Sequence, residues 1–362
     1  MTCFNFSIIL PKMDFVEWSI SVRIPIIYLS ICINIPSMAL YIAEIVTIVR
    51  HKKFQNSFYA LFVMRAIPDL LYVLGTFYAE RLPLIIGAVL YPIYSKFPNW
   101  MFTMFFFIAG HTYQANNLVT GFILLNRLTA IIMPIKHEKL WKKFLPFITI
   151  FVYFVPTLLF WPMFKMDAIL ILNDPNSTTD RSFFVYEAED APYCMYMTYV
   201  SAVFSAILNV LYILINIATF LAYKSHMKKV ATNGANADSI ERKLLIYALA
   251  TFLGHALVAS LFLIRIIGNI NEQTMSLVYY PLVMDTGTVV LSSWLLLWAS
   301  GTFRQQLIKD FSIIRKTTNI QNIRVGPIEG PRNNNHRSIG GAVGHQLQNR
   351  FCSSVQQLPT IS

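Results

Sequence analysis

The residues best suited to chemistry are a few charged and amide side chains inside long apolar stretches. Arg65 and Asp69 are four residues apart, so on a helix they would share one face and neutralise each other. Asn117 and Asp285 each interrupt a different apolar stretch. Ionisable side chains are costly in a membrane and usually face the interior of a helix bundle. These four residues therefore predict a buried polar network.

Three roles remain open for this network. It holds the helices together by hydrogen bonds, it rearranges between two packings of the bundle, or it carries an ion or proton, with Asp69 and Asp285 at the centre of a small cation site. The sequence has no His-Glu-x-x-His motif, no Cys and His at metal-ligand spacing, and no nucleophile or phosphate-binding motif in a suitable context. We therefore predict no enzymatic activity, no cofactor and no metal.

The elements that must position these residues are seven long apolar stretches. A bilayer core about 30 Å thick needs roughly 20 helical residues, and each stretch supplies them. Only helices satisfy their own backbone groups in lipid without closing a barrel. Hydrophobic residues make up 56% of the chain and charged residues 13%, which leaves no second globular domain. We predict an all-α membrane protein, a seven-transmembrane helix bundle with spans at Ile24–Val49, Ser57–Ala79, Trp100–Leu125, Phe144–Phe164, Met195–Ala222, Leu244–Ile267 and Met275–Ser300.

The predicted domains follow from these spans. Residues 1–23 form an extracellular N-terminus and residues 24–300 the transmembrane domain. Residues 301–316 read as a juxtamembrane amphipathic helix, because Phe303, Leu307 and Phe311 recur at helical spacing among basic residues. The polar residues 317–362 predict a disordered cytoplasmic tail. The apolar stretch Leu84–Tyr94 is too short to span and contains a proline, so we expect an interfacial or packed loop segment.

The charge distribution predicts the orientation. The net charge is +11, and most Lys and Arg lie in the connections after spans one, three and five and after span seven. Such an excess marks the cytoplasmic side, so the N-terminus is outside and the C-terminus cytoplasmic. The basic surface then faces anionic membrane lipid, and nucleic acid is not a partner. The glycosylation signals at Asn5 and Asn176 fall on the outer side, as do Cys3 and Cys194, whose pairing stays open.

Two sets of motifs carry a resemblance to known receptors. The segment Asn126–Pro134, which reads NRLTAIIMP, resembles the Asp-Arg-Tyr-x-Ala-Ile-x-x-Pro signature of rhodopsin-like G-protein-coupled receptors, and Pro68–Leu71 resembles their Asp-Leu-Leu. The segments Asn56–Tyr59 and Lys136–Lys143 look like those of the nematode serpentine chemoreceptors, serpentine receptor class gamma or a sister class. The similarity runs from Ile24 to about Lys316 and covers every predicted span.

The chain also departs from the rhodopsin-like pattern. Asn126 stands where an acid normally pairs with the following Arg. Span seven lacks Asn-Pro-x-x-Tyr and span six lacks Cys-Trp-x-Pro. The outer end of span three, Asn99–Met101, lacks the cysteine that usually binds the second outer loop. The activation mechanism of the better-known receptors therefore cannot be copied onto this chain.

The resemblance implies a chemosensory receptor in the plasma membrane of sensory neurons. A small-molecule ligand would bind from outside, and a heterotrimeric G protein would couple at Asn126, Arg127 and Pro134. An Arg there can also be a snorkelling residue that fixes topology, but the Ala-Ile-x-x-Pro register favours the functional role. By depth and chemistry, the expected ligand-lining residues are Tyr78, Phe105, His111, Tyr196, Tyr199 and Tyr280.

Two other functions remain open, a ligand-gated channel and a small-solute transporter. The seven-span channels of insect olfaction place the N-terminus inside, against the charge distribution. A transporter would move solute in liposomes without activating a G protein. The ligand, the type of G protein and the oligomeric state are not encoded in any motif that we find.

Overall fold

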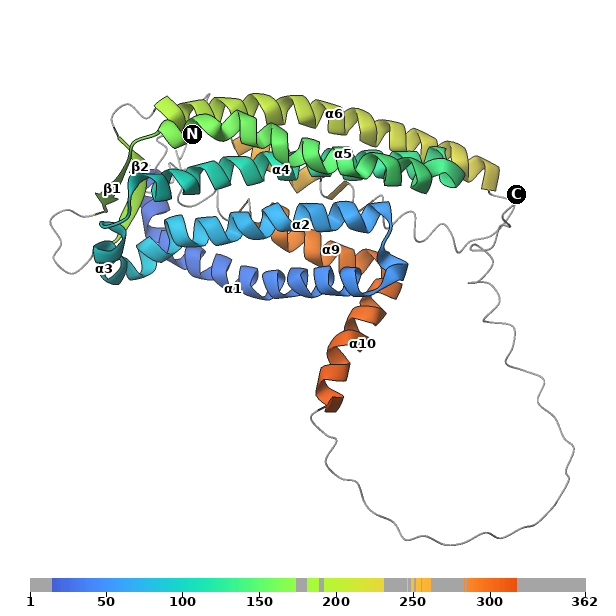
Figure 1. Cartoon of the computed structure of the whole chain (residues 1–362), viewed down its shortest axis with the longest axis horizontal. Helices are drawn as coiled ribbons and strands as arrows, with labels where there is room; N and C mark the ends of the chain where they lie inside the picture. The colour runs from blue at the N-terminus through green and yellow to red at the C-terminus, as the bar shows by residue number, and fades with distance from the viewer. Residues whose placement is uncertain are drawn as a thin grey trace, which may run out of the picture. The chain divides into compact units, whose positions relative to one another are not determined.

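A computed structural model describes residues 15–173, 181–188 and 192–230, parts of 246–261, and residues 283 and 285–317. Long helices dominate, as Figure 1 shows: α1 (Phe15–Arg50), α2 (Ser57–Thr76), α3 (Leu82–Tyr94), α4 (Asn99–Ile132), α5 (Pro134–Phe160), α6 (Pro192–Val230), α9 (Leu291–Ala299) and α10 (Gly301–Thr317). Short 3₁₀ helices are η1 (Lys52–Phe54) and η3 (Trp161–Lys165), and π-helical turns are η2 (Phe77–Arg81) and η4 (Thr286–Val290).

The described residues contain five helical segments long and apolar enough to cross a bilayer, which are Ile24–Arg50, Ser57–Tyr94, Asn99–Ile132, Pro134–Lys165 and Pro192–Ser225. They contain the first five predicted spans completely, and the second continues to Tyr94, well past the predicted end at Ala79. The sixth predicted span and the first part of the seventh lie mostly outside the described residues, and the seventh is described from Asp285 onward. The predicted N-terminal domain is partly helical, because α1 begins at Phe15.

The connection between the third and fourth spans is more helical than expected. We predicted a connection over residues 126–143, but α4 continues to Ile132 and α5 begins at Pro134. Only Met133, with φ −132° and ψ 58°, separates the two helices. Pro134 suits the first turn of a helix, where its missing N–H has no intrahelical acceptor. Arg127 therefore lies more than one turn before the end of α4.

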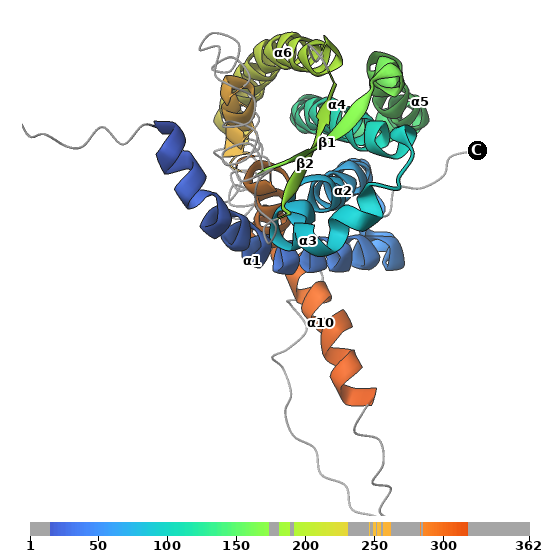
Figure 2. The same ribbon diagram turned by 90° about the vertical axis from the view of Figure 1, so that its left-hand side faces the viewer.

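The interfacial or packed loop segment expected at Leu84–Tyr94 is not a loop, because these residues form helix α3. The π-helical turn η2 joins it directly to α2. The prediction of an all-α protein also omitted one element. This is the antiparallel hairpin of β1 (Ala168–Leu172) and β2 (Phe183–Glu187), in which Leu170 pairs with Val185. In the view of Figure 2 the two strands cross in front of the helix ends, beside α3.

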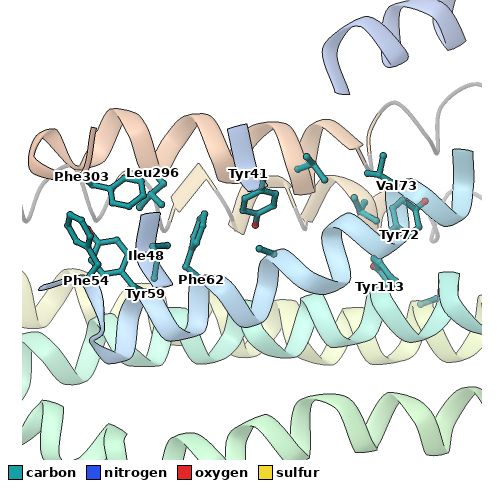
Figure 3. Close-up of a cluster of buried hydrophobic side chains, with 14 residues drawn as sticks. Tyr41, Ile48, Phe54, Tyr59, Phe62, Tyr72, Val73, Tyr113, Leu296 and Phe303 are labelled. Atoms are coloured by element: carbon teal, nitrogen blue, oxygen red, sulfur yellow. The ribbon is translucent and has the colours of Figure 1, made fainter. Parts of the chain in front are cut away.

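The core lies between α1, α2, α4 and the seventh helix. Its main cluster, drawn in Figure 3, includes Tyr41, Phe62, Tyr72, Tyr113 and Leu296. Helix α4 packs against α2, α5 and α6. Near residue 254 the sixth and seventh helices approach closely, since a Cβ added to Gly254 would lie 3.3 Å from the carbonyl oxygen of Gly287. Small residues allow such close packing between membrane helices.

Helix α1 is polar inside and apolar outside. Its buried face carries Ser30, Asn34, Ser37, Tyr41 and Glu44, each no more than 3% exposed. Its other faces expose large apolar side chains, as do those of α5 and α6. This distribution is the reverse of that in a water-soluble helix and is the one expected of a helix surrounded by lipid, because polar groups in lipid are costly.

Candidate functional site

A compact group of hydrogen bonds joins the N-terminal ends of α2 and α5 to the C-terminal end of α4. We call it the inner junction, after its predicted side of the membrane, and it is formed by Ser57, Asn126, Thr129, His137, Glu138 and Trp141. Asn126 donates through Nδ2 to the hydroxyl of Ser57 at 3.0 Å. That hydroxyl donates to Oε2 of Glu138 at 3.0 Å, and the backbone N–H of Ser57 donates to Oε1 at 3.1 Å. The carboxylate of Glu138 thus serves the N-terminus of α2, where helix N–H groups lack partners.

The remaining junction bonds tie α4 to α5. The indole N–H of Trp141 donates to the hydroxyl of Thr129 at 2.8 Å. Both ring nitrogens of His137 are used, since Nδ1 lies 3.1 Å from the Thr129 hydroxyl and Nε2 lies 3.4 Å from that of Ser57. Rhodopsin-like receptors carry an acid directly before the Arg of this motif. Here Asn126 precedes Arg127, and its amide forms a hydrogen bond to Ser57 at the start of α2.

Arg127 lies beside this junction. Its guanidinium carbon is 3.8 Å from the centre of the Phe58 ring, within the range of a cation–π contact. Asn56 caps α2 by accepting from the N–H of Tyr59 at 3.2 Å. The motif segments Asn56–Tyr59 and Lys136–Lys143, far apart in the sequence, therefore meet around Asn126 and Arg127. Pro134 contributes by starting α5 and makes no described side-chain bond to the junction.

Helix α10 is attached next to the junction. Phe303 is fully buried and its ring centre lies 5.1 Å from that of Phe54 and 5.6 Å from that of Tyr59. Nε2 of His51 lies 2.9 Å from Oδ2 of Asp310. Partial burial alone would raise the pKa of Asp310, but hydrogen bonds from Gln306 and His51 outweigh it and hold the pKa below its usual value.

The predicted polar network is divided into separate clusters. Nε of Arg65 lies 3.6 Å from Oδ2 of Asp69 within α2, and the hydroxyl of Tyr41 donates to the same carboxylate at 3.0 Å. The Asn116 amide also donates to Asp69. Its neighbour Asn117 instead lies near Ser205 of α6, at 3.5 Å. The helical periodicity of α4 turns these two adjacent amides toward different helices.

Asp285 belongs to a second cluster, nearer the end that carries the hairpin, which we call the outer ion-pair cluster. It comprises Arg81, Asp285, Ser30 and Asn34. Arg81 at the end of η2 pairs with the carboxylate of Asp285, just before η4. Ser30 donates to Asp285 Oδ2 at 2.8 Å and Asn34 donates to the same oxygen. Asp69 and Asp285 thus have different partners, and no cluster of three metal-ligating side chains occurs in the described part of the chain.

The five expected ligand-lining residues that the structure describes each have their own surroundings. Tyr78 and Tyr199 are about half exposed on the outer surfaces of their helices. Tyr196 donates to the carbonyl of Leu159 at 3.0 Å, and Nε2 of His111 lies 3.1 Å from the carbonyl of Tyr153 in α5. Phe105 packs near the hairpin. Tyr280 lies outside the described residues, as do the glycosylation signals at Asn5 and Asn176.

Asn99 is the first residue of α4, in the segment that lacks the cysteine usual in rhodopsin-like receptors. Its amide donates to the carbonyl of Met166 at 2.9 Å, and its oxygen accepts from the N–H of Ala168 at 2.9 Å. The side chain therefore fastens β1 to the beginning of α4 without a disulfide bond. Cys194 is buried and Cys3 lies outside the described residues, so their pairing stays open.

Comparison with known proteins identifies the family. A sequence model described as the Srg family chemoreceptor matches residues 27–307, most of the chain. The chain belongs to the Srg chemoreceptor family. It is 26% identical over 120 residues to serpentine receptor class gamma-5 of Caenorhabditis elegans, and 27% identical over 128 residues to serpentine receptor class gamma-9 of the same organism. These matches cover 31% and 34% of the chain, and 36% and 38% of the two relatives.

Membership in the Srg family settles the class of the protein. Srg proteins are serpentine receptors built as seven-helix membrane bundles, and they are receptors, not enzymes. The fold class and the class-gamma resemblance expected from the sequence are confirmed. The sequence alone had not pointed to Arg81, Ser30 or Glu138. Arg81 carried a usable signal, because it is a cation directly after an apolar span.

Proposed function

We propose that this Srg protein binds a small external molecule and passes the signal to a heterotrimeric G protein through the inner junction and Arg127. The observation that carries the proposal is the position of Arg127 on α4, stacked on Phe58 where α2, α4 and α5 meet. The contact joins two helices through one cationic side chain. A guanidinium that leaves an aromatic ring can offer several donors to a partner's carbonyl or carboxylate groups.

The junction supplies what a two-state element needs. Ser57 holds Asn126 and Glu138 by hydrogen bonds that other partners or water could replace. A ligand shifts such an equilibrium only through different affinities for its two states. We propose that outer binding favours a packing in which Ser57 and Glu138 separate and Arg127 becomes available. Asn126 makes this release easier than an Asp would, because it holds no charge against the Arg.

The proposed orientation places the junction in the cytosol. Arg127, Lys136, Lys139 and the basic residues that follow the first and fifth predicted spans would then form a cationic surface for the G protein and for anionic lipid. We place the N-terminus outside for the same reason. This orientation separates a G-protein-coupled receptor from the inverted seven-span channels.

The test uses the full chain expressed with a promiscuous G-protein reporter and challenged with a chemical panel. Variant Arg127→Ala should reach the cell surface and lose the response, whereas Lys96→Ala, at an exposed position near the other end of the bundle, should respond like the wild-type protein. An unchanged response of Arg127→Ala at equal surface expression would refute the role given to Arg127. Solute uptake by the purified protein without any G-protein response would favour a transporter.

A further inference from the structure

The outer ion-pair cluster has unused hydrogen-bonding capacity. Three donors, from Ser30, Asn34 and Arg81, converge on a single oxygen of Asp285, its Oδ2. The other oxygen, Oδ1, finds no hydrogen-bond partner among the described residues. An ionised carboxylate can accept hydrogen bonds on both oxygens, and here one of the two is unused within the described part of the chain.

Two side chains that hydrogen-bond to Asp285 also have polar atoms without hydrogen-bond partners in the part of the chain that the structure describes. Nε of Arg81 and Oδ1 of Asn34 also have no hydrogen-bond partner among the described residues. All three side chains are buried, with Arg81 and Asp285 2% exposed and Asn34 3% exposed. Buried polar groups are nearly always paired, so each unpaired one calls for an explanation. These three unpaired atoms belong to side chains that are joined by hydrogen bonds through Asp285, and one shared hydrogen-bond partner would explain all three.

The backbone around the cluster is irregular on both sides. Arg81 is the last residue of the π-helical turn η2, and Asp285 immediately precedes the π-helical turn η4. Such turns within helices are rare and are frequent at functional sites. Strand β2 contacts η2, and the loop before it approaches α3 so closely that a Cβ on Gly87 would lie 2.5 Å from the carbonyl oxygen of Arg181. The hairpin therefore packs over the segment that carries Arg81.

We infer that the outer ion-pair cluster is a ligand-binding site for a small zwitterion that carries an ammonium and a carboxylate group, like a free amino acid. The ammonium would donate to Oδ1 of Asp285 and Oδ1 of Asn34. The carboxylate would accept from Nε of Arg81. The inference rests on the proposed function and supplies the chemical class of its ligand.

Charge balance favours a zwitterion over a lone ion. Arg81 and Asp285 neutralise each other, and burial favours the uncharged form of the neighbouring Glu80, so a ligand with one net charge would leave an uncompensated charge in a buried place. A zwitterion keeps the total at zero and gives hydrogen bonds with charges on both partners, which are stronger than neutral ones. A neutral polyol would match the donors and acceptors but would form weaker bonds.

The test measures binding directly and needs no G protein. The purified full chain in lipid nanodiscs is heated with each standard L-amino acid, with its decarboxylated amine and with its deaminated acid, and glycerol serves as a neutral control. We expect at least one amino acid to raise the melting temperature in a concentration-dependent way. Its amine and its acid should have at least about tenfold lower affinity, since each lacks one charged hydrogen bond.

Variants locate the site. Arg81→Gln and Asp285→Asn should lose the shift, and the matched controls Lys165→Gln and Asp167→Asn, both at exposed outer positions, should keep it. If the ion-pair variants do not fold, Asn34→Ala keeps the ion pair and should weaken binding at least about fivefold by removing one acceptor.

The inference is overturned if no amino acid binds, if the amine, acid or glycerol binds equally well, or if the shift survives in the variants of Arg81, Asp285 and Asn34. Its failure is separable from that of the proposed function. Binding without any reporter response would leave the site in place and refute the G-protein coupling. A reporter response to other chemicals without amino-acid binding would refute the amino-acid site and leave the proposed G-protein coupling in place.

Discussion

Replacing Glu138 by Ala should loosen α2 from α5 at the inner junction. The carboxylate accepts from the N–H and the hydroxyl of Ser57 at 3.1 and 3.0 Å. A hydrogen bond to a charged group contributes about 1.5–3 kcal/mol when buried. Because Glu138 is only half-buried, solvent screening reduces the value, and we expect about 1.5–3 kcal/mol for both bonds together, including the favourable charge at a helix N-terminus.

The assay is thermal unfolding of the purified receptor in detergent. For a protein of this size, 1 kcal/mol corresponds to roughly 2 °C, so Glu138→Ala should melt about 3–6 °C below the wild-type protein. The melting temperature of Glu138→Gln should lie between those of Glu138→Ala and the wild type, because its single amide oxygen can accept only some of the hydrogen bonds that the carboxylate accepts. Lys139→Ala, an exposed neighbour on the same helix, is the matched control and should melt like the wild type.

A double-mutant cycle identifies the interaction. Ser57→Ala and Glu138→Ala should be non-additive by about 1 kcal/mol, because residues in one hydrogen-bond network share their effect. Additive losses would refute the direct contact. A melting temperature of Glu138→Ala equal to that of Lys139→Ala would refute the argument that this carboxylate stabilises the N-terminus of α2.

Three further predictions concern the ends of the bundle. Glu187 accepts from the first N–H groups of α6, at 2.9 and 2.7 Å, so Glu187→Ala should cost about 1–2 kcal/mol and speed hydrogen exchange in that turn alone. Gly87→Ala should cost about 1–3 kcal/mol in thermal unfolding through the clash with the loop before β2, and equal melting would contradict the close approach. The lowered pKa of Asp310 means that its stabilising contribution to the α10 attachment is fully present above the ordinary Asp pKa of about 4 and is lost as pH falls through the lower folded value. Spin-label distances between α10 and η1 should show this loss, and Asp310→Asn should remove the pH dependence over that range.

The sequence predicted well what depends on apolar length and helical spacing. The first five spans follow from hydrophobic stretches of sufficient length, and the Arg65–Asp69 contact follows from a spacing of four on a helix. The helical structure across residues 126–143 was missed, because Arg127 and the charged residues from Lys136 to Lys143 read as a loop. They are compatible with a helix that leaves the membrane.

The tertiary pairs could not be predicted from one sequence. Arg81 and Asp285 are 204 residues apart, and nothing local to either indicates the other. The use of Asn116 and not Asn117 for Asp69 depends on the rotation of α4, which a one-residue difference decides. The hairpin did leave a signal, since the β-branched and aromatic residues at 168–172 and 183–187 favour strands. The expected ligand-lining residues were chosen by depth and chemistry, and neither fixes which way a helical side chain points.

Membrane orientation tests the central claim most directly, because the proposed role of the inner junction requires it to face the cytosol. Epitope tags placed before Met1 and after Ser362 of the full chain would be labelled with antibody in intact and in permeabilised cells. We predict labelling of the first tag in intact cells and of the second only after permeabilisation. The reverse pattern would place Arg127, Ser57 and Glu138 outside the cell and contradict the account.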